Sequence, residues 1–379
     1  MRWQDIVYLD NSSTTMPCET AIVEMNNAAR ENWGNPSSLH IMGIAAEEVI
    51  DNTKAIAAKL LGCDTEEIFF TSGGTESNNL AIFGAVEALK RRGRRVVTTA
   101  VEHSSVKTVF DQLEKQGFEV VRLKPDRYGS ISKEQLYDSI TADTILVSVM
   151  LVNNEIGTVL PVESAAKAIA DKNSPALLHC DAVQAFGKIG LNVRKLGADL
   201  ISISGHKIHA PKGIGVLYKS KKCRIVPRIF GGNQQAGLRS GTEPVPLIAA
   251  LGGAMREIEI EKSLSKVESL NRFAREKLIN TGLVKINSPE DALPYILNVS
   301  VEGYRSETML HFLETKNVFV SSGSACSKGK GSYVLTEIGL PAERVDSALR
   351  ISFCRDNDFE HVELLCDAIV KASKVLRKR

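Results

Sequence analysis

The chain has 379 residues, of which 43% are hydrophobic and 24% charged, values typical of a protein with a large core and about two domains. Its net charge of +2 excludes a global field for capturing nucleic acid or an anionic membrane, so we expect neither partner. Because the seven cysteines show no C-x-x-C pairs and no signal-peptide or membrane-spanning stretch is visible, we expect a reducing, cytoplasmic setting without disulfides or zinc.

Short apolar, β-rich runs alternate with helical patterns between about residues 66 and 218, which predicts an α/β fold with a mostly parallel sheet. The predicted strands are 68–71, 95–99, 119–123, 144–150, 176–180, 199–204 and 215–218. Helical patterns lie between most of them, for example over 77–90, 106–115 and 164–171. We therefore expect a seven-stranded sheet at the centre of a large domain.

The pattern changes after Pro246 to a long, charged amphipathic helix, predicted over 248–280. Short strands and helices follow, and the last helix is predicted over 359–378. This order predicts a second, smaller α+β unit. We assign residues 15–255 to the large domain and residues 1–14 and 256–379 to the small one, with a cleft between them.

Polar residues follow two of the predicted strands, where open α/β sheets bind ligands. Lys207 comes after the strand over 199–204, and a sheltered lysine there can form a Schiff base because desolvation lowers its pKa. Asp181 lies 26 residues earlier and could pair with the pyridine nitrogen of pyridoxal 5′-phosphate (PLP), while Gln184 could reach the phenolic oxygen of that ring. The alternatives are a surface lysine and a helix-capping aspartate.

Two further segments extend this interpretation. Gly74 and Thr75 lie where a strand runs through a glycine turn into a helix, whose first amides suit a phosphate. The turn lacks the G-x-G-x-x-G and P-loop patterns, which leaves nucleotide binding a weak alternative. His103 follows the next strand and could stack on the cofactor ring and move protons, although a lone histidine is more often structural. We expect no metal site, because His206 and His209 lack companion ligands at metal spacing.

Cys326 stands in a segment of glycine and small residues, Ser-Ser-Gly-Ser-Ala-Cys-Ser-Lys-Gly-Lys-Gly over 321–331. Such a loop is expected to be accessible rather than part of a core. Lys328 and Lys330 would favour the thiolate form of the cysteine, which is the nucleophilic form. The alternative is an unreactive cysteine in a flexible loop.

Together these segments resemble the cysteine desulfurases of the NifS/IscS-like group, within the class V, fold-type I PLP enzymes. The similarity covers nearly the whole chain, and its most specific motifs are Ser-Gly-His-Lys at 204–207 and Ser-Ser-Gly-Ser-Ala-Cys at 321–326. The stretch between Cys326 and Ser332 is shorter than in the housekeeping iron–sulfur members, although the motif still resembles the long-loop group.

The resemblance implies a role for each candidate residue. Lys207 would carry PLP, Asp181 would pair with the pyridine nitrogen, Gln184 would bind the phenolic oxygen, and His103 would stack on the ring as acid and base. The phosphate would be held by Gly74, Thr75, Ser204 and His206, together with Thr242 from the partner subunit of a homodimer. Asn154 and Arg350 would face the substrate, with Arg350 binding its carboxylate.

The implied reaction converts L-cysteine to L-alanine and leaves the sulfur on Cys326 as a persulfide. The sulfur acceptor would be a protein such as an iron–sulfur scaffold or a tRNA-thiolation enzyme. Alternatives are a selenocysteine lyase, another class V aminotransferase, for which Cys326 would have no use, and a PLP-fold scaffold without activity.

Overall fold

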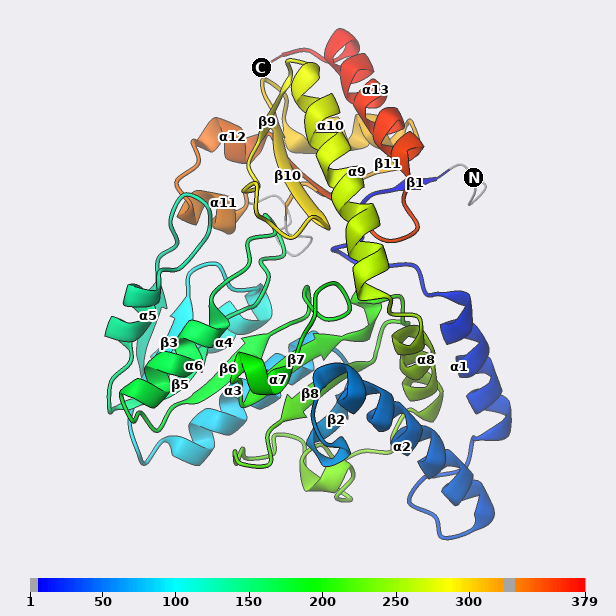
Figure 1. The fold of residues 1–379 in the computed structure, drawn as a ribbon, viewed down its shortest axis with the longest axis vertical. Helices are drawn as coiled ribbons and strands as arrows, with labels where there is room; N and C mark the ends of the chain where they lie inside the picture. Colours follow the sequence, from blue (N-terminus) through cyan, green and yellow to red (C-terminus); the bar gives the residue numbers. More distant parts are fainter. Residues whose placement is uncertain (1–5, 324–330, 379) are drawn as a thin grey trace.

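The chain forms a large lobe and a small lobe, and helix α9 (Ile260–Asn280) extends from the large lobe along the small lobe (Figure 1). The structure is a computed structural model that describes residues 6–323 and 331–378. Cys326 therefore lies outside the described residues. In the part of the chain described, no helix combines the length and apolar character needed to span a membrane.

A seven-stranded sheet occupies the centre of the large lobe, as predicted. Its strands are β2 (Ile68–Thr71), β3 (Arg95–Thr99), β4 (Glu119–Leu123), β5 (Thr144–Ser148), β6 (Leu177–Asp181), β7 (Leu200–Ser204) and β8 (Gly215–Lys219). They lie in the order β2-β8-β7-β6-β5-β3-β4, and only β8 runs antiparallel to its neighbours. The predicted α/β fold class is thus confirmed.

Both faces of this sheet are buried, which explains why its strands are apolar without alternation. Phe69 and Val96 face one hydrophobic cluster, whereas Phe70 and Val97 face the other, because successive strand residues point to opposite sides. The one buried histidine of β6, His179, is held between Ser148 (2.8 Å) and Ser202 (3.0 Å). Burial lowers the pKa of His179 to about 3, so it is a neutral part of the core.

Helices cover the sheet and the adjoining end of the large lobe. They are α1 (Glu19–Glu31), α2 (Ile41–Leu61), α3 (Gly74–Leu89), α4 (Ser104–Lys115), α5 (Lys133–Ser139), α6 (Val162–Asp171), α7 (Val193–Leu196) and α8 (Val245–Arg256). Three short 3₁₀ helices, η2 (Thr65–Glu67), η3 (Gly205–Lys207) and η4 (Gln235–Gly237), complete the lobe. Helices α1 and α2 both pack on α8, where Gly252 and Gly253 allow close approach.

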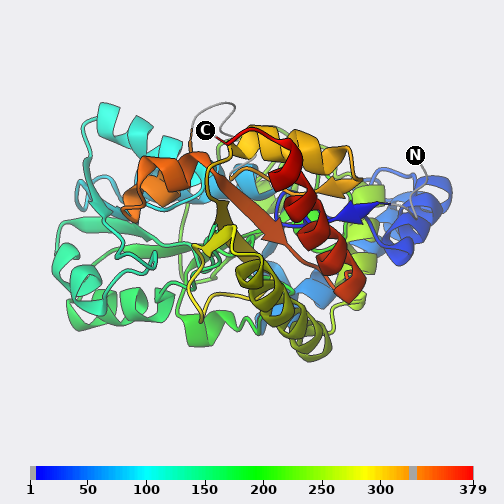
Figure 2. The same ribbon diagram turned by 90° about the horizontal axis from the view of Figure 1, so that it is seen from above.

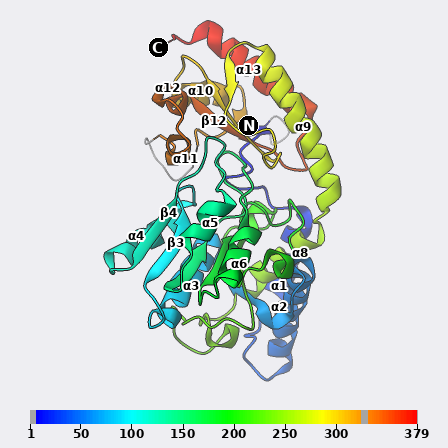
Figure 3. The ribbon, with the colours of Figure 1, turned by 60° about the vertical axis from the view of Figure 1, so that its left-hand side comes forward.

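The small lobe contains the antiparallel sheet β12-β10-β9, made of β9 (Val284–Ile286), β10 (Ile296–Val301) and β12 (Ala348–Ser352). Its helices are α10 (Ser306–Glu314), α11 (Tyr333–Glu337), α12 (Ala342–Asp346) and α13 (Phe359–Val375), and α13 packs beside α9 (Figure 3). The N-terminal strand β1 (Val7–Tyr8) pairs with β11 (Val318–Phe319) and lies beside α13 (Figure 2). The exact domain boundaries stay a prediction.

The single helix predicted over 248–280 was wrong, because residues Glu257 to Glu259 separate α8 from α9. Arg355 stabilises this break: its guanidinium donates to the Glu257 carbonyl at 2.7 Å and pairs with the Glu257 carboxylate. The break redirects the chain from the large lobe to the small lobe. The sequence does change character here, because α8 is buried at every position from 248 to 255 whereas α9 buries only one face.

We predict that Gly253→Ala destabilises the protein by about 1–3 kcal/mol, the usual cost of overpacking. The added methyl group would lie 2.9 Å from the Thr20 carbonyl oxygen and 3.1 Å from the Ala21 backbone, which outweighs the better helix propensity of alanine. Urea unfolding measures the change. Gly190→Ala is the control, because nothing lies within 4 Å of its added methyl group; equal stabilities of the two variants would contradict this packing.

Candidate active site

A cavity of about 260 Å³ lies beyond the C-terminal ends of β6 and β7, bounded by the small lobe at Arg350 of β12. It brings together every predicted site residue except Thr242 and Cys326. These residues are Gly74, Thr75, His103, Asn154, Asp181, Gln184, Ser204, His206, Lys207 and Arg350. Because they come from separate strands and loops, only the fold places them in one site; their individual roles stay predictions.

Lys207 reaches the cavity from η3, directly after β7. Its Nζ donates to the carbonyl oxygens of Ser12 (2.5 Å) and Ser13 (2.6 Å), in the segment that follows β1. The lysine is half-buried, and these two backbone carbonyls direct its amine. A lysine held in this way is suited to Schiff-base chemistry.

Asp181 and His103 are linked by a buried chain of hydrogen bonds. The Asn78 amide nitrogen donates to Asp181 Oδ2 and to Ser105 Oγ, both at 2.8 Å. Ser105 Oγ lies 2.8 Å from His103 Nδ1, and the Val183 amide binds the other Asp181 oxygen at 3.0 Å. The chain holds the carboxylate and the imidazole in fixed positions at the same cavity wall.

His103 also caps helix α4, which determines its tautomer. The Ser105 backbone amide donates to His103 Nδ1 at 3.2 Å, so the neutral ring carries its proton on Nε2. Burial lowers the pKa of His103, although Asp181 opposes the shift; Lys207 and Arg350 lower it further. At neutral pH the ring is therefore uncharged and able to accept a proton.

The N-terminus of α3 forms the end of the cavity predicted to hold a phosphate. Gly74 packs so closely that a Cβ there would lie 2.8 Å from Val183 Cγ2, and Gly73 has a φ of 147°. Ser204 and His206 line the same end, and burial, followed by the charge of Lys207, lowers the pKa of His206 to about 4. A neutral imidazole, a hydroxyl and helix amides are donors that fit a phosphate.

Arg350 crosses the cavity wall from β12 with only 2% of its surface exposed. Its Nη2 pairs with Asp10 at 3.0 Å and donates to Ser13 Oγ at 2.5 Å, while Nη1 donates to the Asn154 carbonyl at 2.9 Å. Its backbone pairs with Ser321, which lies just before the segment carrying Cys326. The contacts with Asp10, Ser13 and the Asn154 carbonyl thus fix the position of the guanidinium.

The polarity of the cavity wall tests whether the cavity suits a ligand. Asn78 Oδ1, Asn154 Oδ1 and Arg350 Nε are buried without a hydrogen-bond partner among the described residues. Such atoms cost free energy, and three of the eight among the described residues belong to side chains of this cavity wall, which is therefore a polar one. Together with the carboxylate of Asp181 and the amine of Lys207, the donor set fits PLP.

The sequence interpretation missed several residues of the site. Asn78, Ser105, Ser12 and Ser13 line the cavity, and Asp10 supports Arg350. Asn78 follows Gly74 by one helical turn, and this i, i+4 spacing could have indicated that both face the ligand. Thr242 is exposed and does not line this cavity of its own chain within the described residues.

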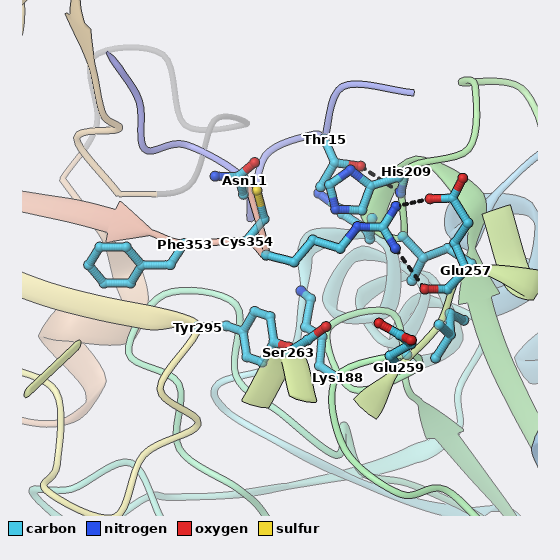
Figure 4. A pocket seen from close by; sticks show the side chains of 15 residues that line it. Asn11, Thr15, Lys188, His209, Glu257, Glu259, Ser263, Tyr295, Phe353 and Cys354 are labelled. Carbon is cyan, nitrogen blue, oxygen red and sulfur yellow. Dashed lines mark hydrogen bonds and ion pairs between the residues drawn. The ribbon is translucent and has the colours of Figure 1, made fainter. Parts of the chain in front are cut away.

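A smaller cavity of about 40 Å³ adjoins the first and shares Lys207 with it (Figure 4). His209 and Cys354 line it, and a ring nitrogen of His209, the Cys354 sulfur and a carboxylate oxygen of the exposed Asp356 lie within 4.8 Å of one another. The sequence spacing around His209 gave no sign of this group, which the tertiary structure brings together; the expected absence of a metal site stays a prediction. Arg355 Nε lies 3.9 Å from Asp356 Oδ1 and competes with any cation for that carboxylate.

The chain matches the family model of the class V aminotransferases over residues 7–365. It is 39% identical to cysteine desulfurase IscS of Methanosarcina thermophila, over 98% of this chain and 93% of that protein. It is 38% identical to the putative cysteine desulfurase IscS 1 of Bacillus subtilis, over 98% of this chain and 99% of that protein.

Solved structures show the same similarity. A NifS-like protein superposes with a TM-score of 0.93 at 37% identity, covering 98% of this chain and 100% of that one. SspA in complex with cysteine superposes with a TM-score of 0.82 at 35% identity, covering 91% of this chain and 98% of that one.

Glu102, directly before His103, has a fully buried carboxyl group that makes the stability of the protein depend on pH. Its Oε1 accepts from Met150 N (2.8 Å) and Thr99 Oγ1 (3.0 Å), and burial raises the pKa of Glu102 to about 8. The folded protein therefore keeps this proton between about pH 4.5 and pH 8, whereas the unfolded chain releases it. Stability from this group falls as pH rises through that interval.

Glu102→Gln should remove this loss of stability at high pH, because glutamine has no proton to release. Between pH 5 and pH 8 the free energy of unfolding of the variant should rise by at least about 1 kcal/mol relative to that of the parent. Urea unfolding at both pH values measures the difference. Glu276→Gln, at an exposed position of α9, is the control and should show no pH-dependent gain. A constant difference between Glu102→Gln and the parent at the two pH values would contradict a protonated Glu102.

Proposed function

Because the chain belongs to the class V aminotransferase family, we propose that it is a PLP-dependent cysteine desulfurase. It converts L-cysteine to L-alanine and takes the sulfur onto Cys326 as a persulfide. The observation that carries the proposal is the single cavity in which Lys207, Asp181, His103 and Arg350 meet. The similarity to cysteine desulfurases over 98% of the chain supports the choice of reaction.

PLP, when bound, acts as an electron sink that makes the α-proton of an amino acid acidic. Lys207 would hold it covalently, Asp181 would pair with its ring nitrogen and Gln184 would bind its phenolic oxygen. Gly74, Thr75, Ser204 and His206 would hold the phosphate. These residues keep the group close to Arg350, on the small-lobe side of the cavity.

Arg350 is the binding group for the substrate carboxylate. Its planar fork suits a carboxylate, which an arginine can bind through two parallel N–H groups. The Asp10 and Ser13 contacts hold the guanidinium in place before substrate arrives, so little orientation is lost on binding. Asn154, with an unpaired side-chain oxygen, lies next to this position and faces the substrate amino acid.

Two bases serve the proton transfers. Lys207 Nζ moves the α-proton of the substrate, because it is the flexible amine of the cavity. His103 is neutral at pH 7 and accepts or returns a proton at Nε2, since Nδ1 is occupied by Ser105. The buried chain through Asn78 keeps this imidazole beside Asp181 while protons move.

Sulfur transfer is the step assigned to Cys326. Its thiolate attacks the substrate sulfur, the carbon–sulfur bond breaks with its electron pair remaining on the substrate, and that carbon gains a proton to give L-alanine. L-cysteine and the thiol thus become L-alanine and a persulfide, with atoms and electrons balanced. The described residues on either side of the segment support this role, because Ser321 pairs with Arg350 and Ser332 binds Glu155.

We also propose a homodimer that completes each site with Thr242 of the partner chain. Thr242 is exposed, and large apolar side chains available for an interface are exposed as well: Trp33 (69%), Leu39 (96%), Ile41 (74%) and Phe230 (79%). A persulfide must pass to a further protein, such as an iron–sulfur scaffold or a tRNA-thiolation enzyme. A reducing compartment such as the cytoplasm would keep the thiol of Cys326 active.

Cys326→Ala should bind PLP and L-cysteine but form neither persulfide nor L-alanine, because the sulfur has no acceptor. The measurements are intact-mass analysis after incubation with L-cysteine and an alanine assay. Cys63→Ala is the matched control: burial raises the pKa of Cys63 to about 12, so its thiol is inert and its loss should leave turnover unchanged. Full alanine production by Cys326→Ala would overturn the desulfurase proposal and favour an aminotransferase.

Arg350→Lys should raise KM for L-cysteine roughly tenfold or more, because a lysine keeps the charge but loses the fork. The effect on kcat should be smaller, since the carboxylate lies away from the sulfur. Arg275→Lys is the control, because Arg275 is a half-buried arginine of α9 that binds the carbonyls of Ser288 and Pro289, outside the cavity. An unchanged KM for Arg350→Lys would show that the carboxylate binds elsewhere.

A further inference from the structure

Lys188 is a buried cation that the proposed reaction does not use. It lies at the wall of the smaller cavity beneath the site, and only 6% of it is exposed. Its side chain points toward Tyr295, whose ring centroid lies 5.7 Å from Nζ (Figure 4). Burying an ammonium costs free energy, so its retention here calls for a function other than stability.

A short chain of hydrogen bonds connects Lys188 to Lys207. Lys188 Nζ donates to Gln184 Oε1 at 2.8 Å, and Gln184 Nε2 donates to the Ser12 carbonyl at 2.9 Å. The same Ser12 carbonyl accepts from Lys207 Nζ at 2.5 Å. The two lysines are therefore joined through one amide side chain and one backbone oxygen.

This chain fixes which end of the Gln184 amide faces the ligand. Below its pKa of about 7, Lys188 is an ammonium with three donors and no acceptor, so in this form it can bind only the oxygen of Gln184. Nε2 must then point the other way, and one of its two hydrogens goes to Ser12. The second hydrogen is left for an acceptor in the cavity that Gln184 lines.

The charged and titratable groups around Lys188 come from several elements. They are Lys207, His206 and His209 near η3, Arg350, Cys354 and Arg355 at β12 and the turn after it, Tyr295 before β10, and Glu257 and Glu259 between α8 and α9. Burial, followed by the charges of Lys207 and Arg350, lowers the pKa of Lys188 to about 7. The Glu257 and Glu259 carboxylates are already paired with Arg355 and Lys262, so among the described residues Gln184 is the hydrogen-bonding partner of Lys188.

We propose that Lys188 is a positioning residue that acts through Gln184: it holds the amide with its NH₂ group toward the phenolic oxygen of the cofactor. The proposal rests on the PLP-dependent function proposed above. A donor fixed at that oxygen stabilises its negative charge and makes the nitrogen that joins Lys207 to the cofactor a weaker base. Lys188 would thereby set the pH at which this nitrogen gains a proton.

Lys188→Met tests this proposal in the enzyme purified with its cofactor. Methionine keeps the length of the side chain but removes the donor, so the Gln184 amide becomes free to turn. The pH at which the visible absorption of the bound cofactor changes should rise by roughly one unit. Thermal melting of the same variant should be unchanged or higher, because a buried charge has been removed; a purely structural lysine would give lower melting and no spectral shift.

Lys219→Met is the matched control. Lys219 is half-buried, whereas Lys188 is buried; Lys219 donates to the carbonyls of Ser220 and Cys223, and its Nζ lies 6.0 Å from the Phe69 ring centroid. It sits at the far end of the β7–β8 pair, where Leu200 faces Lys219, whereas Ser204 faces Gly215 at the cavity end. Its substitution should leave the spectral titration at the parent pH.

A double-variant cycle tests the route through Gln184. In a Gln184→Leu background, Lys188→Met should shift the titration by much less than in the parent, because the amide it positions is gone. An equal shift in both backgrounds, or no shift in either, would overturn the proposal. Failure of the desulfurase function itself is recognised separately, because parent enzyme would then form no persulfide on Cys326 whatever the behaviour of Lys188.

Discussion

The carbonyl oxygen of Ser12 is the contact on which the site depends. It accepts from Lys207 Nζ and from Gln184 Nε2, both in the large lobe, while the Ser12 amide binds Ser352 Oγ in the small lobe at 2.8 Å. The neighbouring Asp10 pairs with Arg350. One short N-terminal segment therefore joins the groups assigned to the cofactor and to the substrate, and it fixes the distance between them.

Burial shapes the chemistry of this site more than charge pairing does. It lowers the pKa values of His103, His206 and Lys188 and raises those of Glu102 and Glu155. Burial thus favours the neutral form of each group, and the pKa values of Glu102 (about 8) and Lys188 (about 7) allow these two to exchange protons near pH 7. The cost in stability is carried by a core that covers both faces of the seven-stranded sheet.

The positions of the strands followed from the sequence because each is a short apolar run bounded by turns, and a sheet covered on both faces demands such runs. The break between α8 and α9 at Glu257 was not predicted from the sequence, because it is held by Arg355, almost a hundred residues later. The same limitation hid Asp10 and Ser12: their partners, Arg350 and Lys207, are distant in the chain. Cys326, placed by its motif, lies outside the described residues.

By itself the sequence determined the residue types of the site and the strand ends that carry them, because Lys207, Asp181 and His103 each follow an apolar run. Only the tertiary structure decided which atoms meet: the Asn78 amide between Asp181 and Ser105, the Lys188 ammonium on Gln184, and His209 beside Cys354. The physical reason is that local periodicity records which face of an element is buried. Hydrogen bonds between distant segments leave no such periodic trace.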